Sequence, residues 1–114
     1  MILFAGLPVA DLASARAWYE RLLGRPPDVI PNENEVVWQL AEAGWIYVVE
    51  DGERAGRGLL TLIVDDLDDE LATLAERGVA AGPIDEGAVV RKLEITDPDG
   101  NKVTFGQPLG STSR

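Results

Sequence analysis

The 114-residue sequence contains no cysteine and no histidine. Without cysteine it can form no disulfide, no thiolate nucleophile and no zinc–thiolate site. Without histidine it lacks the commonest general base and the commonest transition-metal ligand of proteins. Any metal ion would therefore need a site built from oxygen ligands alone.

Basic residues are scarce, with 10 Lys and Arg against 20 Asp and Glu, which gives a formal net charge of -10. This balance argues against a nucleic-acid partner, because phosphates need a basic face. It is compatible with a cationic ligand that is attracted electrostatically. The simpler explanation is that the acidic surface keeps a cytoplasmic protein soluble.

Targeting and cofactor motifs are also missing. The apolar N-terminal segment MILFAGLPVA has no basic residue before it and alternates like a strand, so we do not expect a signal peptide. No stretch reaches the length of a membrane span, and we expect a cytoplasmic protein with no membrane partner. The sequence has no Gly-rich phosphate loop, nucleophile elbow or dinucleotide fingerprint.

The most informative feature that is present is an internal repeat. The segment LPVADL at residues 7–12 recurs as LIVDDL at residues 62–67, and VVWQL at 36–40 recurs as VVRKL at 89–93. The two offsets nearly agree, which indicates two copies of one unit. We therefore predict one domain over residues 1–107, with repeats at about 1–55 and 56–107. Residues 108–114 are predicted to be a flexible tail.

Each repeat begins with an apolar strand and a helix. Asp11 is placed to cap the first helix and Gly24 to end it, and Asp66 and Gly78 play the same parts in the second. Apolar residues at helical spacing follow the first cap: Leu12, Ala15, Trp18, Tyr19, Leu22 and Leu23. Strand signals follow each helix, so each repeat is predicted as strand, helix and three strands.

The segment DPDGN near the end of the second repeat could be a metal loop or a turn. Pro98 fixes its own backbone, and Gly100 supplies the positive φ of a tight reversal between two strands. A calcium loop needs more oxygen donors at alternate positions than Asp97 and Asp99 provide. We interpret the segment as a turn.

The duplicated unit, the opening Leu-x-Val-x-Asp-Leu and the closing DPDGN turn resemble the vicinal oxygen chelate superfamily. This superfamily includes glyoxalase I, extradiol dioxygenases and bleomycin-resistance proteins. The resemblance covers nearly the whole chain and implies an α+β fold. In that fold two βαβββ repeats form curved mixed sheets around a cavity, with the helices on the convex side. It also implies a homodimer.

Metal-dependent members of the family carry two histidines and a glutamate at positions that fall on Phe4, Leu59 and Thr104 here. None of these three residues can bind a divalent metal usefully, so the resemblance implies a metal-free branch with no cofactor. Alternation along the strands places the three on the cavity side, together with Tyr47 and Thr61.

Trp38 and its repeat counterpart Arg91 are two further candidates for ligand binding. Both lie on predicted strands next to the cavity strands. Their apolar neighbours in phase, Leu40 and Leu93, make a core-facing orientation as well supported as a pocket-facing one. Their faces stay open at this point.

Three functions are compatible with these features. The first is a metal-free small-molecule-binding protein, resembling the antibiotic-sequestering branch, for an aromatic or cationic organic ligand. Phe4, Tyr47 and Leu59 would give stacking and apolar contact, and Thr61 and Thr104 would give hydrogen bonds. The second is a lyase, isomerase or dioxygenase-like enzyme with a non-standard site, whose acid–base candidates are Tyr47, Glu50, Lys92 and Glu94. The third is a regulatory or scaffolding domain whose cavity is filled by its own side chains.

Overall fold

The computed structural model describes residues 1–110. The first half contains β1 (Leu3–Val9), α1 (Leu12–Leu23), β2 (Val29–Asn32), β3 (Glu35–Ala41) and β4 (Gly44–Glu50). The second half contains β5 (Leu59–Ile63), α2 (Leu67–Glu76), β6 (Asp85–Glu86), β7 (Val90–Thr96) and β8 (Lys102–Pro108). The predicted succession of strand, helix and three strands is thus confirmed in both halves.

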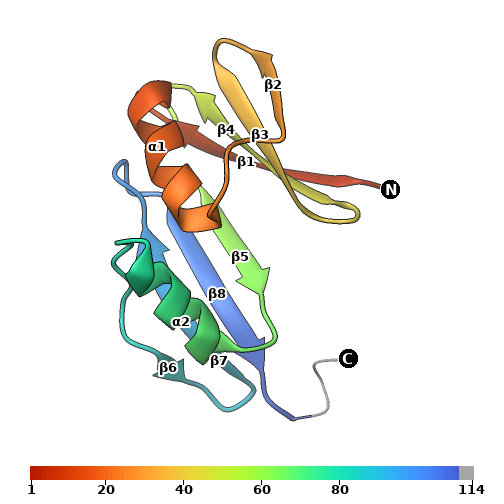
Figure 1. Cartoon of the computed structure of the whole chain (residues 1–114), viewed down its shortest axis with the longest axis vertical. Helices are drawn as coiled ribbons and strands as arrows, with labels where there is room; N and C mark the ends of the chain where they lie inside the picture. Colours follow the sequence, from red (N-terminus) through yellow and green to blue (C-terminus); the bar gives the residue numbers. More distant parts are fainter. Residues whose placement is uncertain (111–114) are drawn as a thin grey trace.

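Each half forms its own four-stranded mixed sheet (Figure 1). The strand orders are β1-β4-β3-β2 and β5-β8-β7-β6. The first strand of each half pairs in parallel with the last, and the other pairs are antiparallel. The edge strands β1 and β5 contact each other, which brings the two sheets together. The α+β fold with duplicated βαβββ units is confirmed.

The helix boundaries follow from local capping. The Asp11 carboxylate accepts a hydrogen bond from the Ser14 N–H at 3.1 Å, which satisfies one free amide at the start of α1. Gly24 ends α1 with φ at +79°, a conformation that glycine adopts without steric cost. Asp66 caps α2 in the same way, through the N–H of Asp69 at 3.0 Å.

The hydrophobic core lies between the sheets and the two helices and is continuous through both halves. Its largest fully buried apolar and aromatic side chains are Leu7, Tyr19, Trp38, Leu67, Leu74, Leu93 and Ile95. Figure 1 shows both helices on one side of the sheets. We call the sheet surfaces turned away from the helices the open faces. Neither helix of the described residues 1–110 is long and apolar enough to cross a membrane.

The DPDGN segment is a turn, and it also ties the two halves together. Asp97 is buried, and its Oδ1 accepts the backbone N–H groups of Asp99, Gly100 and Asn101 at 2.8–2.9 Å. Its Oδ2 accepts the Tyr19 hydroxyl and the Asn101 amide, both at 2.7 Å. Both oxygens of the Asp97 carboxylate therefore accept hydrogen bonds from the protein itself.

The repeat register differs from the sequence prediction in the third strand of each half. Trp38 pairs with Ile46 of β4, and it is Ile95 that pairs with the equivalent Val103 of β8. Ile95, not Arg91, is therefore the structural counterpart of Trp38. The shift is even, so it leaves each side chain on the same face of its sheet.

The last described residues continue the second sheet. β8 runs to Pro108, and the Leu109 N–H donates to the Val89 carbonyl at 2.9 Å. The segment predicted as a flexible tail therefore begins with residues that pair with the fold. Residues 111–114 of that segment lie outside the described residues.

Candidate functional site

The alternation of the strands places most of the candidate residues on the open faces. Phe4 is 53% exposed on β1, and Leu59 is 83% exposed on β5. Thr104 lies on β8 between the buried Val103 and Phe105, and it is paired with Thr61. All four therefore point away from the core, as the sequence pattern predicts.

An aromatic strip crosses the open face of the first sheet. Phe4 and Trp45 are neighbours in the β1–β4 register, and their rings stack with centroids 5.6 Å apart and an interplanar angle of 8°. Tyr47 follows on the same face of β4, opposite Gly6. We call Phe4, Trp45 and Tyr47 the aromatic strip.

Gly6 makes room for the Tyr47 ring. A Cβ atom at this position would lie 2.5 Å from Tyr47 Cζ, well inside van der Waals contact. The ring can therefore lie flat across β1 only because residue 6 has no side chain. A glycine inside a strand is a known sign of such a close approach, and sequence reasoning missed it here.

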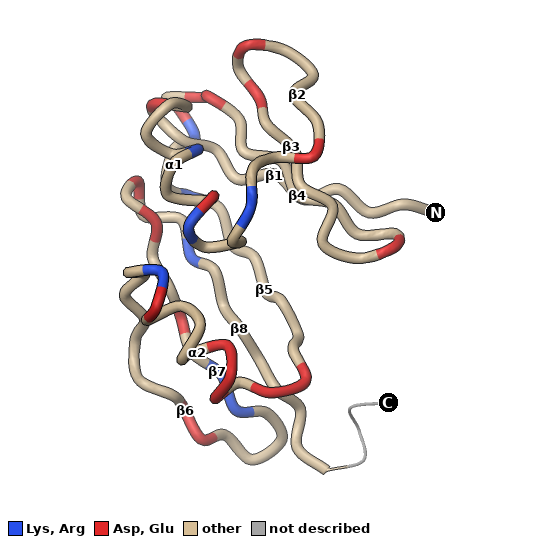
Figure 2. Tube along the Cα trace, viewed as in Figure 1, with Lys and Arg blue, Asp and Glu red and all other residues tan. Residues whose placement is uncertain are grey.

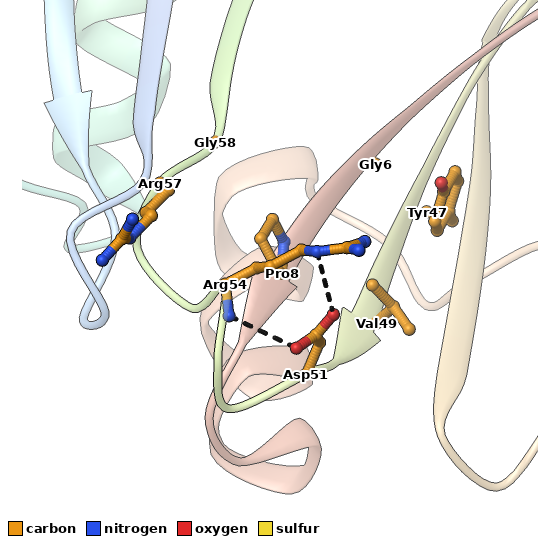
Figure 3. A pocket seen from close by; sticks show the side chains of 8 residues that line it. All are labelled: Gly6, Pro8, Tyr47, Val49, Asp51, Arg54, Arg57 and Gly58. Carbon is orange, nitrogen blue, oxygen red and sulfur yellow. Dashed lines mark hydrogen bonds and ion pairs between the residues drawn. The ribbon is translucent and has the colours of Figure 1, made fainter.

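A pocket of about 400 Å³ lies beside the strip (Figure 3). We call it the first-sheet pocket. This volume is within the usual range for small-molecule sites, roughly 300–1,000 Å³. Its lining comes from β1, from β4 and from the segment that joins β4 to β5: Gly6, Pro8, Tyr47, Val49, Asp51, Arg54, Arg57 and Gly58.

The joining segment has a fixed path over the end of β1. The Asp51 N–H donates to the Val9 carbonyl at 2.9 Å, and the Gly56 N–H donates to the Pro8 carbonyl at 3.3 Å. Gly56 has φ at +84°, and a Cβ there would lie 2.1 Å from the Asp99 carbonyl oxygen. Only glycine fits this position, so the segment forms a defined wall of the pocket.

Thr104, a candidate residue of the second sheet, lines a different pocket. Thr104 borders a cavity of about 250 Å³ together with Pro83, Asp85, Lys92, Leu93 and Glu94. Lys102, on the same face, lies 3.9 Å from the Glu94 carboxylate and donates to Thr96 Oγ1 at 3.1 Å. Thr104 thus has charged neighbours, and it is separate from the aromatic strip of the first sheet.

Trp38 lies in the core. Its side chain is fully buried, its Nε1 donates to the Arg25 carbonyl at 3.0 Å, and its ring is 6.3 Å from that of Tyr19 on α1. The orientation that the sequence left open is therefore the core-facing one. A ligand on the open face would not touch this side chain.

Arg91 also points to the helix side of its sheet. Its guanidinium donates to Asp68 of α2 at 3.2 Å and to Glu86 at 2.9 Å. The hydrogen bond to Asp68 has the larger effect on the pKa of Arg91, followed by the one to Glu86, and both raise it. The residue is an ion-pair partner between α2 and β6, and it does not line the open face.

Of the four acid–base candidates for an enzyme, Lys92 and Glu94 share the pocket of Thr104, and the other two lie elsewhere. Glu50 accepts the Leu12 N–H at 3.0 Å and so contributes to the start of α1. Lys92 and Glu94 lie on the second sheet, whereas Tyr47 lies on the first. The four residues therefore do not form one site.

The positions where the resemblance implies metal ligands do not fit a metal. Phe4 and Leu59 offer only hydrocarbon, and Thr104 offers a neutral hydroxyl. Within residues 1–110, no three side chains of His, Cys, Asp or Glu are grouped so that they could hold an ion.

Comparison with known proteins agrees with the fold. Residues 2–105 match the family model described as "Glyoxalase/Bleomycin resistance protein/Dioxygenase superfamily". A glyoxalase/bleomycin resistance protein from Catenulispora acidiphila is 46% identical, with a TM-score of 0.90 over 96% of this chain and 99% of that one. Among curated proteins, none matches the chain significantly.

Two further solved structures share the fold. TnmS3, an antibiotic binding protein from Streptomyces sp., is 26% identical, with a TM-score of 0.78 over 96% of both chains. A lactoylglutathione lyase from Agrobacterium tumefaciens is 18% identical, with a TM-score of 0.77 over 94% of this chain and 92% of that one. The second likeness extends to the fold alone. With the family model matching almost its entire length, the chain belongs to the glyoxalase/bleomycin resistance/dioxygenase superfamily.

Proposed function

We propose that this protein binds a small organic ligand without a metal ion, on the open face of its first sheet. The observation that carries the proposal is the stacked pair on that face of Phe4, which is 53% exposed, and Trp45, which is partly buried. Phe4 occupies the first position at which the resemblance implies a metal ligand. A planar hydrocarbon surface there favours a ligand with an aromatic or conjugated body.

An antibiotic or a related natural product fits this site. The aromatic strip continues into the first-sheet pocket of about 400 Å³, which leaves room for a ligand larger than a single ring. The likeness to TnmS3, whose description is antibiotic binding protein, supports the same class. An enzyme of this superfamily is the second candidate, but Tyr47 and Glu50 lie apart from the pocket that Lys92 and Glu94 share.

The proposal includes a homodimer. Leu59 and Ile63 are 83% and 63% exposed on the open face of β5, and a partner subunit would cover them. A second copy of the chain related by a twofold axis would bury these residues, because the same surface is buried on both copies of such a dimer. Sedimentation should show a dimer at micromolar concentration. A monomer at high micromolar concentration would contradict this part of the proposal.

The test begins with a thermal-shift screen of antibiotics, natural products and metabolites in a buffer that contains EDTA. A ligand that binds only the native state raises the unfolding temperature. The best hit is then titrated by tryptophan emission, since Trp45 belongs to the proposed site. Phe4→Ala should weaken binding roughly tenfold, through the loss of one aromatic contact.

Ile30→Ala is the matched control. Ile30 is 54% exposed, nearly the same as Phe4, but it lines a separate pocket beside the start of α1. Its removal should leave the affinity unchanged. Equal affinities of wild type and Phe4→Ala would show that the ligand does not use the aromatic strip.

A further inference from the structure

We infer that the first-sheet pocket takes a carboxylate of an aromatic ligand, held by Arg54 beside the Tyr47 ring. The inference rests on the proposed function, and it adds the charge of the ligand and the residue that recognises it. It differs from the cation that the net charge of -10 favours at long range.

Arg54 reaches across the pocket. Its backbone N–H donates to Asp51 Oδ1 at 3.3 Å, and its Nε lies 3.8 Å from Asp51 Oδ2. Figure 3 shows the side chain extended from the joining segment toward Tyr47. The Asp51 carboxylate lies on the Nε side, so the two terminal nitrogens of the guanidinium stay available. Within residues 1–110 these two nitrogens donate no hydrogen bond, and the Arg54 side chain is 81% exposed.

Arg57 adds a second positive charge to the wall. Figure 3 shows it across the pocket from Tyr47, with its side chain pointing away from Arg54. No ion pair involves Arg57 in the described part of the chain. The residues that line the pocket therefore include two arginines and one acidic residue, Asp51.

This local excess of positive charge stands out in an acidic protein. Figure 2 shows acidic residues spread over both halves, many of them in loops and at helix ends. Salt screens exposed charges that lie more than about 10 Å from the pocket. A carboxylate inside the pocket would instead meet the Arg54 fork at hydrogen-bond distance. Short-range pairing should therefore outweigh the general acidity.

The remaining lining explains why the ligand should be aromatic and singly charged. Pro8, Val49 and the Tyr47 ring form an apolar floor next to the guanidinium. Two parallel N–H groups of an arginine match the two oxygens of a carboxylate. A planar hydrocarbon body with one carboxylate satisfies both parts of the wall, because the body packs on the apolar floor and the carboxylate pairs with Arg54.

Three probes that share one ring system test the inference: naphthoate, naphthamide and naphthylmethylammonium. Each is titrated calorimetrically into the 114-residue protein at neutral pH. Naphthoate should bind tightest, by roughly three- to tenfold over naphthamide, which is the range expected for an exposed charge-assisted contact. Naphthylmethylammonium should bind weakest.

Arg54→Gln should remove the advantage of naphthoate and leave naphthamide binding unchanged. Arg54→Lys, which keeps the charge but loses the fork, should keep part of that advantage. Arg21→Gln is the matched control, because Arg21 is exposed on α1 and the same net charge is lost. Circular dichroism and thermal melting confirm that the variants are folded.

The outcomes separate the inference from the proposed function. Suppose that naphthamide binds and that Tyr47→Ala weakens its binding. The inference is then overturned, and the proposed function stands, if naphthoate binds no tighter than naphthamide. The same holds if naphthoate binds tighter but Arg54→Gln does not alter the difference. Tightest binding of naphthylmethylammonium has the same consequence. If none of the three probes binds wild type up to its solubility limit, the inference is overturned, and the screen of antibiotics and natural products alone decides on the proposed function.

Discussion

The Tyr19 hydroxyl donates a 2.7 Å hydrogen bond to Asp97 Oδ2, which joins α1 of the first half to the β7–β8 turn of the second. Both residues are buried. The other Asp97 oxygen is held by three backbone amides of its own turn. This contact fixes the relative position of the two halves on the helix side, while β1 and β5 contact each other at the sheet edges.

Tyr19→Phe should lower the free energy of unfolding by about 1–3 kcal/mol, because a buried carboxylate loses one of its donors. Urea unfolding measures the change. Tyr47→Phe, on the open face, should cost less than about 0.5 kcal/mol. A double-mutant cycle of Tyr19→Phe with Asp97→Asn should show coupling. A cycle without coupling would mean that the two side chains do not interact in solution.

Stability should also fall in alkali through Tyr19. Burial, then the hydrogen bond to Asp97, raises the pKa of Tyr19 well above its usual value near 10. The folded state therefore keeps this proton at a pH where the unfolded chain has lost it. The contribution of Tyr19 is complete below about pH 10 and declines as the pH rises further.

Urea unfolding between pH 8 and pH 11 measures this loss. Tyr19→Phe should show a shallower decline than wild type, since Tyr47 and the lysines are common to both proteins. Parallel curves for the two proteins would contradict the role of Tyr19.

Gly6→Ala should damage the site without unfolding the protein. The new methyl group would displace the Tyr47 ring, which lies 2.5 Å from the position of that Cβ, but the ring can rotate outward into solvent. We expect little change in melting temperature. Binding of naphthamide should weaken about as much as in Tyr47→Ala. Unchanged affinity would show that the position of the ring does not matter for binding.

Strand parity could be predicted from the sequence because it needs only the alternation of buried and exposed residues. On β8, Val103 and Phe105 are buried and Thr104 is not, and this pattern is visible in the letters. On β3 the pattern fails, since Val36, Val37 and Trp38 are all buried. Consecutive apolar residues leave the phase of a strand undetermined, and so the face of Trp38 stayed open.

The repeat register and the cross-half contacts could not be predicted in the same way. The sequence similarity of VVWQL and VVRKL aligns Trp38 with Arg91. The strand pairing instead makes Ile95 the structural equivalent of Trp38. Tyr19 and Asp97 are 78 positions apart, and no local pattern couples them. Arg54 belongs to a pocket only because the joining segment bonds to β1, which also depends on the tertiary fold.

The most direct test of the central claim is ligand titration with and without metal. Protein treated with EDTA and dialysed is titrated with naphthamide, alone and after addition of Zn, Ni, Mn or Fe ions. Because Phe4, Leu59 and Thr104 offer no usable metal ligand, we predict the same dissociation constant in every case and no tightly held metal by elemental analysis. Binding that requires an added metal, or retention of about one ion per chain after dialysis, would contradict the account.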